Sequence, residues 1–216
     1  VKDAQKAIIK YVNEKGNVEL SRDAVAGKSG EAIDYSTAAK ISSYKRQGYE
    51  LVSDGFTSAS SKNFDFDASV DQEFTVVLRE RIEPIDPDKP TPTPDKPVDP
   101  NDPDTPKWPD PVKDIVNKET VTRTIHYVYE DGTKAHDDIN GQPVIFTHDG
   151  ERDEVTNEDM WNDWKTKKDS FDKVQSPEIA GYIPNVDAVP EIKVKPTDSD
   201  IDRTVTYKAD EQKAKL

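Results

Sequence analysis

The sequence contains no cysteine, a single methionine and no run of about 18 apolar residues. The lack of cysteine excludes disulfides and thiolate chemistry, and the lack of a long apolar run excludes a membrane-spanning helix. Only 32% of the residues are hydrophobic, so any core must be small, with Tyr, Val and Ile supplying much of it. No signal-peptide pattern opens the chain, and we expect a fragment of a longer protein.

Basic residues are also in short supply. The 30 Lys and Arg face 44 Asp and Glu, which gives a net charge of −14. Nucleic-acid binding needs a basic face that displaces counterions from phosphates, and anionic membrane surfaces attract basic segments. The composition therefore argues against both partners, while the length of 216 residues allows two domains of about 100 residues each.

Signatures of catalysis are missing as well. The sequence has no glycine-rich phosphate loop and no nucleophile elbow. His126, His136 and His148 are 10 and 12 residues apart, which is not the close spacing of metal ligands. Pairs of carboxylates occur throughout so acidic a chain and identify no glycosidase. We predict that the protein is not an enzyme and has no cofactor.

Proline is concentrated in one segment. Eleven of the 16 prolines lie in residues 84–111, where they exclude helix and central strand and favour polyproline II. At about 3.1 Å per residue, residues 87–111 would span roughly 75–80 Å. The segment also contains loose PxxP patterns, which a proline-binding domain would read, but such patterns are unavoidable in this composition. We predict a semi-rigid linker.

The segments on either side of this linker resemble each other. The pattern I-x-Y-V-x-E-x-G occurs at 9–16 and again at 125–132, and the dipeptide Gly-Tyr occurs at 48–49 and 181–182. Each half then ends in an alternating strand, at 74–78 and at 201–207. Three landmarks in the same order indicate an internal duplication.

The pattern of each half predicts a small α+β domain. Each I-x-Y-V segment alternates and ends in a glycine turn, as a strand entering a hairpin does. In the first half, Ser36 is a candidate N-cap of a helix through about Gln47, with Ala38, Ile41 and Tyr44 on one stripe. Strand, strand, helix, strand, strand is the order of a β-grasp (ubiquitin-like) domain.

We therefore predict an α+β, β-rich fold, with two β-grasp domains in an elongated tandem. The predicted parts are residues 1–83, the polyproline-II-like linker 84–111 and residues 112–216. In the second domain, residues 143–176 are expected to add strands and little helix.

Several of these segments resemble a known family. Residues 123–135 (RTIHYVYEDGTKA) and 170–210 are similar to the C-terminal domain of mucus-binding protein repeats, and residues 48–56 and 65–80 resemble their N-terminal domain. Such repeats occur in cell-surface adhesins of lactobacilli. The resemblance implies β-grasp folds, a cell-wall-anchored extracellular parent protein and binding to mucin glycans. It supplies no set of ligand-contacting residues.

Two acidic runs are candidate calcium sites, because Ca²⁺ prefers carboxylate oxygens. One consists of Asp198, Asp200 and Asp202, and the other is the run Asp65, Asp67 and Asp71. Neither has the glycine and terminal glutamate of an EF-hand loop, and solvated turns are the favoured interpretation.

Aromatic side chains are the remaining candidates for sugar contact, because the C–H face of a sugar packs on a ring. Trp161 and Trp164 are spaced i, i+3 and flanked by acids and amides, so one of them is a candidate exposed ligand-binding ring. Packing in the core is the stronger interpretation for both.

Three functions stay open. The first is weak binding to mucin glycans by a monomeric fragment, with avidity from repetition along the parent protein. Mucin is polyanionic, as this chain is, so we expect binding to strengthen as the pH falls toward the pI of about 4.7. The second is an immunoglobulin or other host-protein partner, bound at a sheet edge or helix face. The third is a passive stalk spacer.

Overall fold

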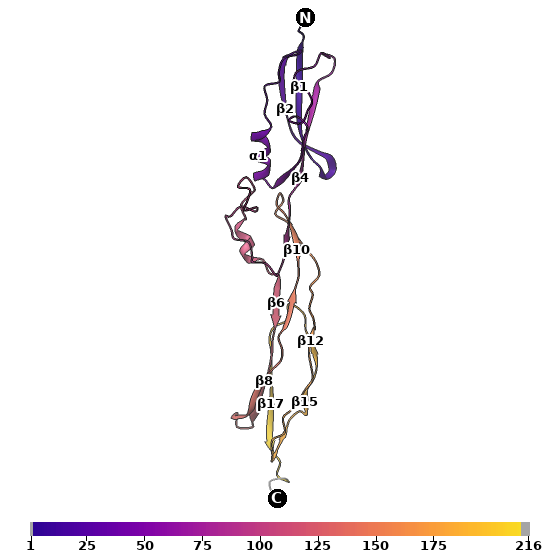
Figure 1. The fold of residues 1–216 in the computed structure, drawn as a ribbon. Coiled ribbons are helices and arrows are strands. Elements are labelled where there is room, and N and C mark those ends of the chain that lie inside the picture. The colour runs from indigo at the N-terminus through magenta and orange to yellow at the C-terminus, as the bar shows by residue number, and fades with distance from the viewer. Residues whose placement is uncertain (1, 213–216) are drawn as a thin grey trace. The chain divides into compact units, whose positions relative to one another are not determined.

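The computed structural model describes residues 2–212, which divide into two compact units (Figure 1). Unit 1 runs up to Ile85 and adds Lys89–Ile115 and Gly150–Trp161. Unit 2 consists of Asp86–Asp88, Val116–Asp149 and the chain from Asn162 onward. These limits differ from the predicted boundaries, and the division into 1–83, 84–111 and 112–216 stays a prediction.

Unit 1 is built on a four-stranded sheet in the order β2-β1-β4-β3. The strands are β1 (Ala4–Asn13), β2 (Val18–Lys28), β3 (Tyr49–Asp54) and β4 (Gln72–Glu80), with a 3-10 turn, η1 (Lys15–Asn17), between the first two. β1 pairs antiparallel with β2 and parallel with β4, so the first and last strands lie side by side at the centre. The inward residues Ile9, Tyr11 and Val76 are fully buried there.

One helix, α1 (Ala38–Arg46), packs against this sheet (Figure 1). Tyr44 is buried and Ile41 is half-buried against the core, as predicted, but Ala38 is exposed. Thr37 directly precedes α1 but its side chain makes no capping hydrogen bond, whereas Ser36 Oγ accepts a 3.3 Å hydrogen bond from the Ala38 amide in the first turn. The Thr37 hydroxyl instead donates to Asp54, which ties the start of α1 to the end of β3.

Unit 2 repeats the strand order of unit 1 without the helix. Its main sheet is ordered β14-β17-β7-β8, from β7 (Arg123–Tyr129), β8 (Lys134–Asn140), β14 (Tyr182–Pro184) and β17 (Ile201–Ala209). β7 and β17 are parallel, as β1 and β4 are. In both repeats the hairpin register shifts directly after the tyrosine of the I-x-Y-V pattern, at Tyr11 and at Tyr127. The predicted internal duplication is therefore visible in the fold.

The rest of unit 2 consists of short paired strands. β6 (Lys118–Val121) pairs with β9 (Val144–Thr147), β12 (Ser170–Phe171) with β16 (Ile192–Lys193), and β13 (Val174–Gln175) with β15 (Ala188–Val189). Two small apolar clusters lie beneath these strands. One forms around Phe146 and Phe171, and the other around Tyr127 and Tyr207. Tyr207 and Val205 pack in the second cluster, as the alternation predicted.

The proline-rich segment does not form the free, extended spacer that its composition predicts. Residues 89–115 belong to unit 1. Across a hairpin-like turn, the Val98 amide donates to the Pro106 carbonyl and the Trp108 amide donates to the Lys96 carbonyl, and η2 (Asp110–Asp114) follows. The Asp102 carboxylate lies 2.7 Å from the Lys45 amine on α1. Its Oδ1 also accepts a hydrogen bond from the Asp104 amide, which forms a local turn. Asp104 likewise pairs with Arg46 of α1, and Asp99 lies 3.7 Å from Arg81, which directly follows β4.

A second sheet in unit 1 joins the end of the first half to part of the second. It is ordered β11-β10-β5, from β5 (Ile82–Ile85), β10 (Gly150–Asp153) and β11 (Asp159–Trp161). The turn after β10 packs on Gly48, where an added Cβ would lie 2.3 Å from the Glu154 carbonyl oxygen. Only glycine fits this close approach, and its φ of +106° also favours glycine.

Burial of Glu154 in this turn generates a prediction about pH. Desolvation raises the pKa of Glu154 to about 7, although Arg152 lies close by, and Glu154 Oε1 has no hydrogen-bond partner among the described residues. An unfolded glutamate ionises near pH 4.5, so the unfolded state loses its proton first as the pH rises. Stability should therefore fall between about pH 4.5 and 7, by on the order of 3 kcal/mol.

We expect Glu154→Gln to remove this fall and to be more stable than the wild type at pH 8, while matching it at pH 4. Calorimetric unfolding at both pH values measures the difference. Exposed Glu151→Gln serves as the control for the change of net charge. An unchanged pH dependence in Glu154→Gln would contradict the burial argument.

Candidate functional site

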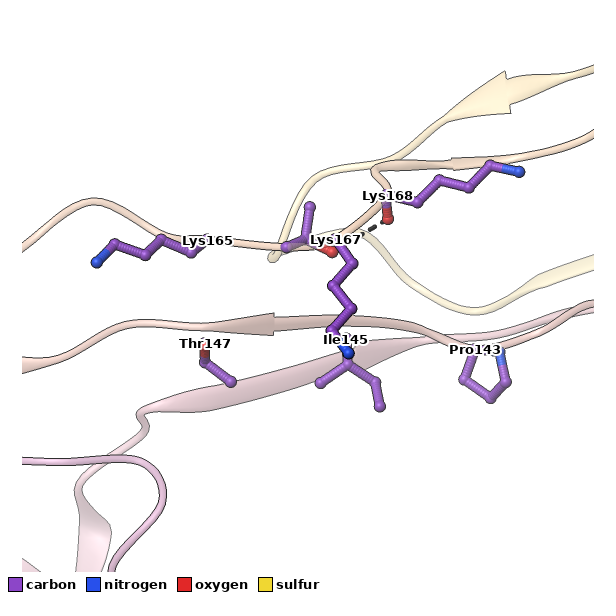
Figure 2. A pocket seen from close by; sticks show the side chains of 7 residues that line it. Pro143, Ile145, Thr147, Lys165, Lys167 and Lys168 are labelled. Carbon is purple, nitrogen blue, oxygen red and sulfur yellow. Dashed lines mark hydrogen bonds between the residues drawn. The ribbon is translucent and has the colours of Figure 1, made fainter.

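A pocket of about 520 Å³ lies in unit 2 between strand β9 and the segment 165–168. The residues on the β9 side of the pocket are apolar or carry a hydroxyl group, and those on the opposite side are mostly lysines. The lining residues are Pro143, Ile145, Thr147, Lys165, Thr166, Lys167 and Lys168 (Figure 2). No carboxylate is among them, although the chain has 44 acidic residues.

The alternation of β9 places one side of this pocket. Val144 and Phe146 point into the apolar cluster and are 4% exposed. The side chains between and after them, Ile145 and Thr147, therefore face the other way, and Ile145 is 44% exposed. The strand thus offers an apolar surface at the floor of the pocket.

Two backbone hydrogen bonds close one end of the pocket. The Thr147 amide donates to the Lys165 carbonyl at 2.9 Å, and the Lys165 amide donates to the Thr147 carbonyl at 2.7 Å. Lys168 Nζ is paired with Asp172 at 2.5 Å, whereas Lys165 and Lys167 form no ion pair with a carboxylate within residues 2–212. The pocket can therefore attract and hold an anion.

Trp164 lies directly before this basic segment and is part of the fold. Its indole stacks on the His148 imidazole, with ring centroids 3.7 Å apart and planes within 8°. It also packs against the cluster around Phe146, while His148 Nε2 lies 2.8 Å from the Val116 carbonyl oxygen. The core interpretation fits Trp164, and a sugar contact by its remaining surface stays a prediction.

Trp161 is placed differently. It lies on β11 in unit 1, is 38% exposed, and covers Gly150 of the neighbouring strand. The two tryptophans that the sequence paired thus belong to different units. Trp161 keeps an accessible ring face, and its role in ligand binding stays a prediction.

The aspartates of the run Asp198–Asp202 contact separate parts of unit 2. Asp198 accepts a hydrogen bond from the Lys195 amide, Asp200 accepts one from the Thr122 amide at 2.8 Å, and Asp202 contacts His126. Asp198 and Asp200 thus accept backbone amides beside the sheet, while Asp202 lies on β17, and calcium binding by this run stays a prediction.

The run Asp65–Asp71 behaves in a similar way. Asp65 and Asp67 accept hydrogen bonds from nearby amides, and Asp71 lies 3.9 Å from the Lys6 amine. Within residues 2–212, no group of three or more His, Asp or Glu side chains is arranged to hold a metal ion. In the same range, no helix is long and apolar enough to cross a membrane.

His126 lies on the open face of the sheet between two carboxylates. Its Nε2 is 3.2 Å from Asp202 and its Nδ1 is 3.0 Å from Asp138. The hydrogen bond with Asp202, and then that with Asp138, raises the pKa of His126. The imidazole therefore takes up a proton more readily as the pH falls. Once protonated, His126 on β7 forms ion pairs with Asp138 on β8 and with Asp202 on β17.

Sequence reasoning did not single out the pocket. The run K-T-K-K at 165–168 holds three lysines in four residues of an acidic chain, and this local reversal of charge was the available signal. Pro143, Ile145 and Thr147 gave no signal, because their contribution depends on how β9 pairs with the rest of the unit.

The packing of the two tryptophans generates a prediction about stability. Trp164→Ala should lower the free energy of unfolding by about 3 kcal/mol, because it removes the stacked ring and opens the cluster. Trp161→Ala should cost less than about 1 kcal/mol, because its ring is more exposed. Urea unfolding followed by circular dichroism measures both, and equal losses would contradict the different placements.

Comparison with known proteins connects these features to a family. A family model described as a mucin binding domain matches residues 5–80, and one described as a Muc B2-like domain matches residues 112–211. Among curated proteins, none matches the chain.

Two solved structures match nearly the whole chain. The crystal structure of Mub-RV is 29% identical, with a TM-score of 0.73, and the match covers 95% of this chain and 99% of that one. The type 2 repeat of the mucus binding protein MUB from Lactobacillus reuteri is 31% identical, with a TM-score of 0.51, and the match covers 95% of this chain and 100% of that one. The chain belongs to the family of MUB-type mucus-binding protein repeats.

Proposed function

We propose that the chain is a repeat of a bacterial cell-surface adhesin that binds host mucus through mucin glycans. The observation that carries this proposal is the match over 95% of the chain to a repeat of the mucus binding protein MUB. The mucin binding domain model at residues 5–80 supports it. The matching relatives are adhesion modules and give no positive evidence for catalysis.

The proposal extends to domain organisation and location. The strand order β2-β1-β4-β3 with its helix, and the order β8-β7-β17-β14 in unit 2, support two β-grasp domains. The two family matches support domains at 1–83 and 112–216 on either side of the proline-rich segment. We place the chain outside the cell, in a cell-wall-anchored parent protein.

A single copy should bind weakly, as one module of a multi-repeat adhesin does. Repetition along a parent protein raises the effective concentration of the second and later contacts, so avidity can exceed the affinity of one copy by orders of magnitude. The experiment must therefore present several copies together.

The test measures retention of the 216-residue chain, displayed as tetramers, on immobilised mucin before and after enzymatic removal of the glycans. We expect retention at pH 7 that increases at pH 5 and is lost with the glycans. Parallel runs with Ca²⁺ and with a chelator test the acidic runs, and calcium-independent retention would dismiss them.

The other outcomes identify the alternatives. Retention that survives removal of the glycans would favour recognition of protein, and binding to deglycosylated immunoglobulin would identify that partner. No retention under any condition would leave a passive spacer and overturn the proposed function.

A further inference from the structure

Strand β9 directs part of its backbone into the pocket that it forms with residues 165–168, on the edge away from β6. The His148 amide donates to Asn117, on the side of β6, whereas Thr147 bonds to Lys165 on the opposite side. Successive residues of a strand direct their amide and carbonyl to alternate edges, and β9 pairs with β6 without a register shift. The amide and carbonyl of Ile145 therefore point to the edge that Thr147 shares with Lys165.

Lysine supplies the charge on the other side of this gap. Figure 2 shows Lys167 reaching across toward Ile145, while Lys165 and Lys168 extend toward the two ends of the pocket. Lys167 is exposed and has no ion-pair partner within residues 2–212. An anion bound here would give this lysine a charge-assisted hydrogen bond, which it otherwise makes only with water.

The occupant must combine a negative charge with an apolar face. The charge would lie at Lys167, and the face would cover Pro143 and the exposed side chain of Ile145. A long polyanion such as nucleic acid is disfavoured, because a chain of net charge −14 repels it as a whole. A short ligand with one anionic group avoids most of this repulsion, which salt screens beyond about 10 Å.

We propose that this pocket binds an acidic sugar, that is, a terminal glycan unit that carries a carboxylate or a sulfate. The acidic group lies at Lys167, the C–H face of the ring covers Ile145, and the sugar hydroxyls reach the backbone of β9. This inference rests on the proposed function, and it explains how an acidic repeat holds a polyanionic glycoprotein: contact is local and charge-matched although the long-range field is repulsive.

The test is a calorimetric titration of the intact chain with three oligosaccharides that share a neutral lactosamine core. One is unmodified, one carries a terminal sialic acid and one carries a sulfate, so the two sources of negative charge are separated. We expect binding of one or both acidic sugars, weaker at higher salt, and no measurable binding of the neutral core.

Three variants locate the binding. Lys167→Glu should weaken binding of the acidic sugar at least about tenfold, which is the loss of one charge-assisted contact. Ile145→Asp should weaken binding as well, because it places a carboxylate on the floor of the pocket, where it would repel an anionic ligand. The matched control is Lys193→Glu, an exposed lysine of unit 2 that does not line the pocket. It makes the same change of net charge, and we expect it to bind like the wild type.

The outcomes separate this inference from the proposed function. Glycan-dependent retention on mucin, with equal affinities in Lys167→Glu and Lys193→Glu, would overturn the pocket and leave the proposed function standing. Binding of the neutral core as tightly as the acidic sugars would also overturn it. Loss of mucin retention in the wild type would overturn the proposed function itself. Unchanged circular dichroism spectra and thermal midpoints establish that each variant is folded.

Discussion

The parallel pairing of a first strand with a last strand is the constraint on which both units depend. β1 lies beside β4, and β7 lies beside β17, so the chain that leaves each first strand must return to it. In a sequence with so few apolar residues, the pair also holds much of the core, through Tyr11 and Tyr127. Both aromatic rings come from the same position of the repeated pattern.

The sequence predicted the features that depend on short-range periodicity. Alternation predicted the buried strands around Ile9 and Ile125, and the stripe containing Tyr44 predicted α1 to within two residues at each end. The repeated landmarks predicted the duplication that the two sheets show. These features are local, because period two and period 3.6 fix which residues face inward before any long-range contact forms.

Features that depend on distant partners were not predictable in the same way. Proline content indicates polyproline II, but it does not reveal that Asp102 finds Lys45 on a helix far along the chain. Trp161 and Trp164 looked like one motif, yet β10 and β11 place the first in unit 1, while stacking on His148 holds the second in unit 2. The pocket at Ile145 likewise arises from pairing across some 20 residues.

Charge connects the fold to the proposed recognition. A chain of net charge −14 gains nothing from long-range attraction to mucin, so recognition must rest on a site from which carboxylates are absent, as in the pocket lined by Lys167. The most direct measurement is a two-dimensional amide NMR titration of the intact chain with the acidic sugar. We expect the largest shifts at Ile145, Thr147 and residues 165–168; shifts confined to Trp161 or to the sheet of unit 1 would contradict binding in this pocket.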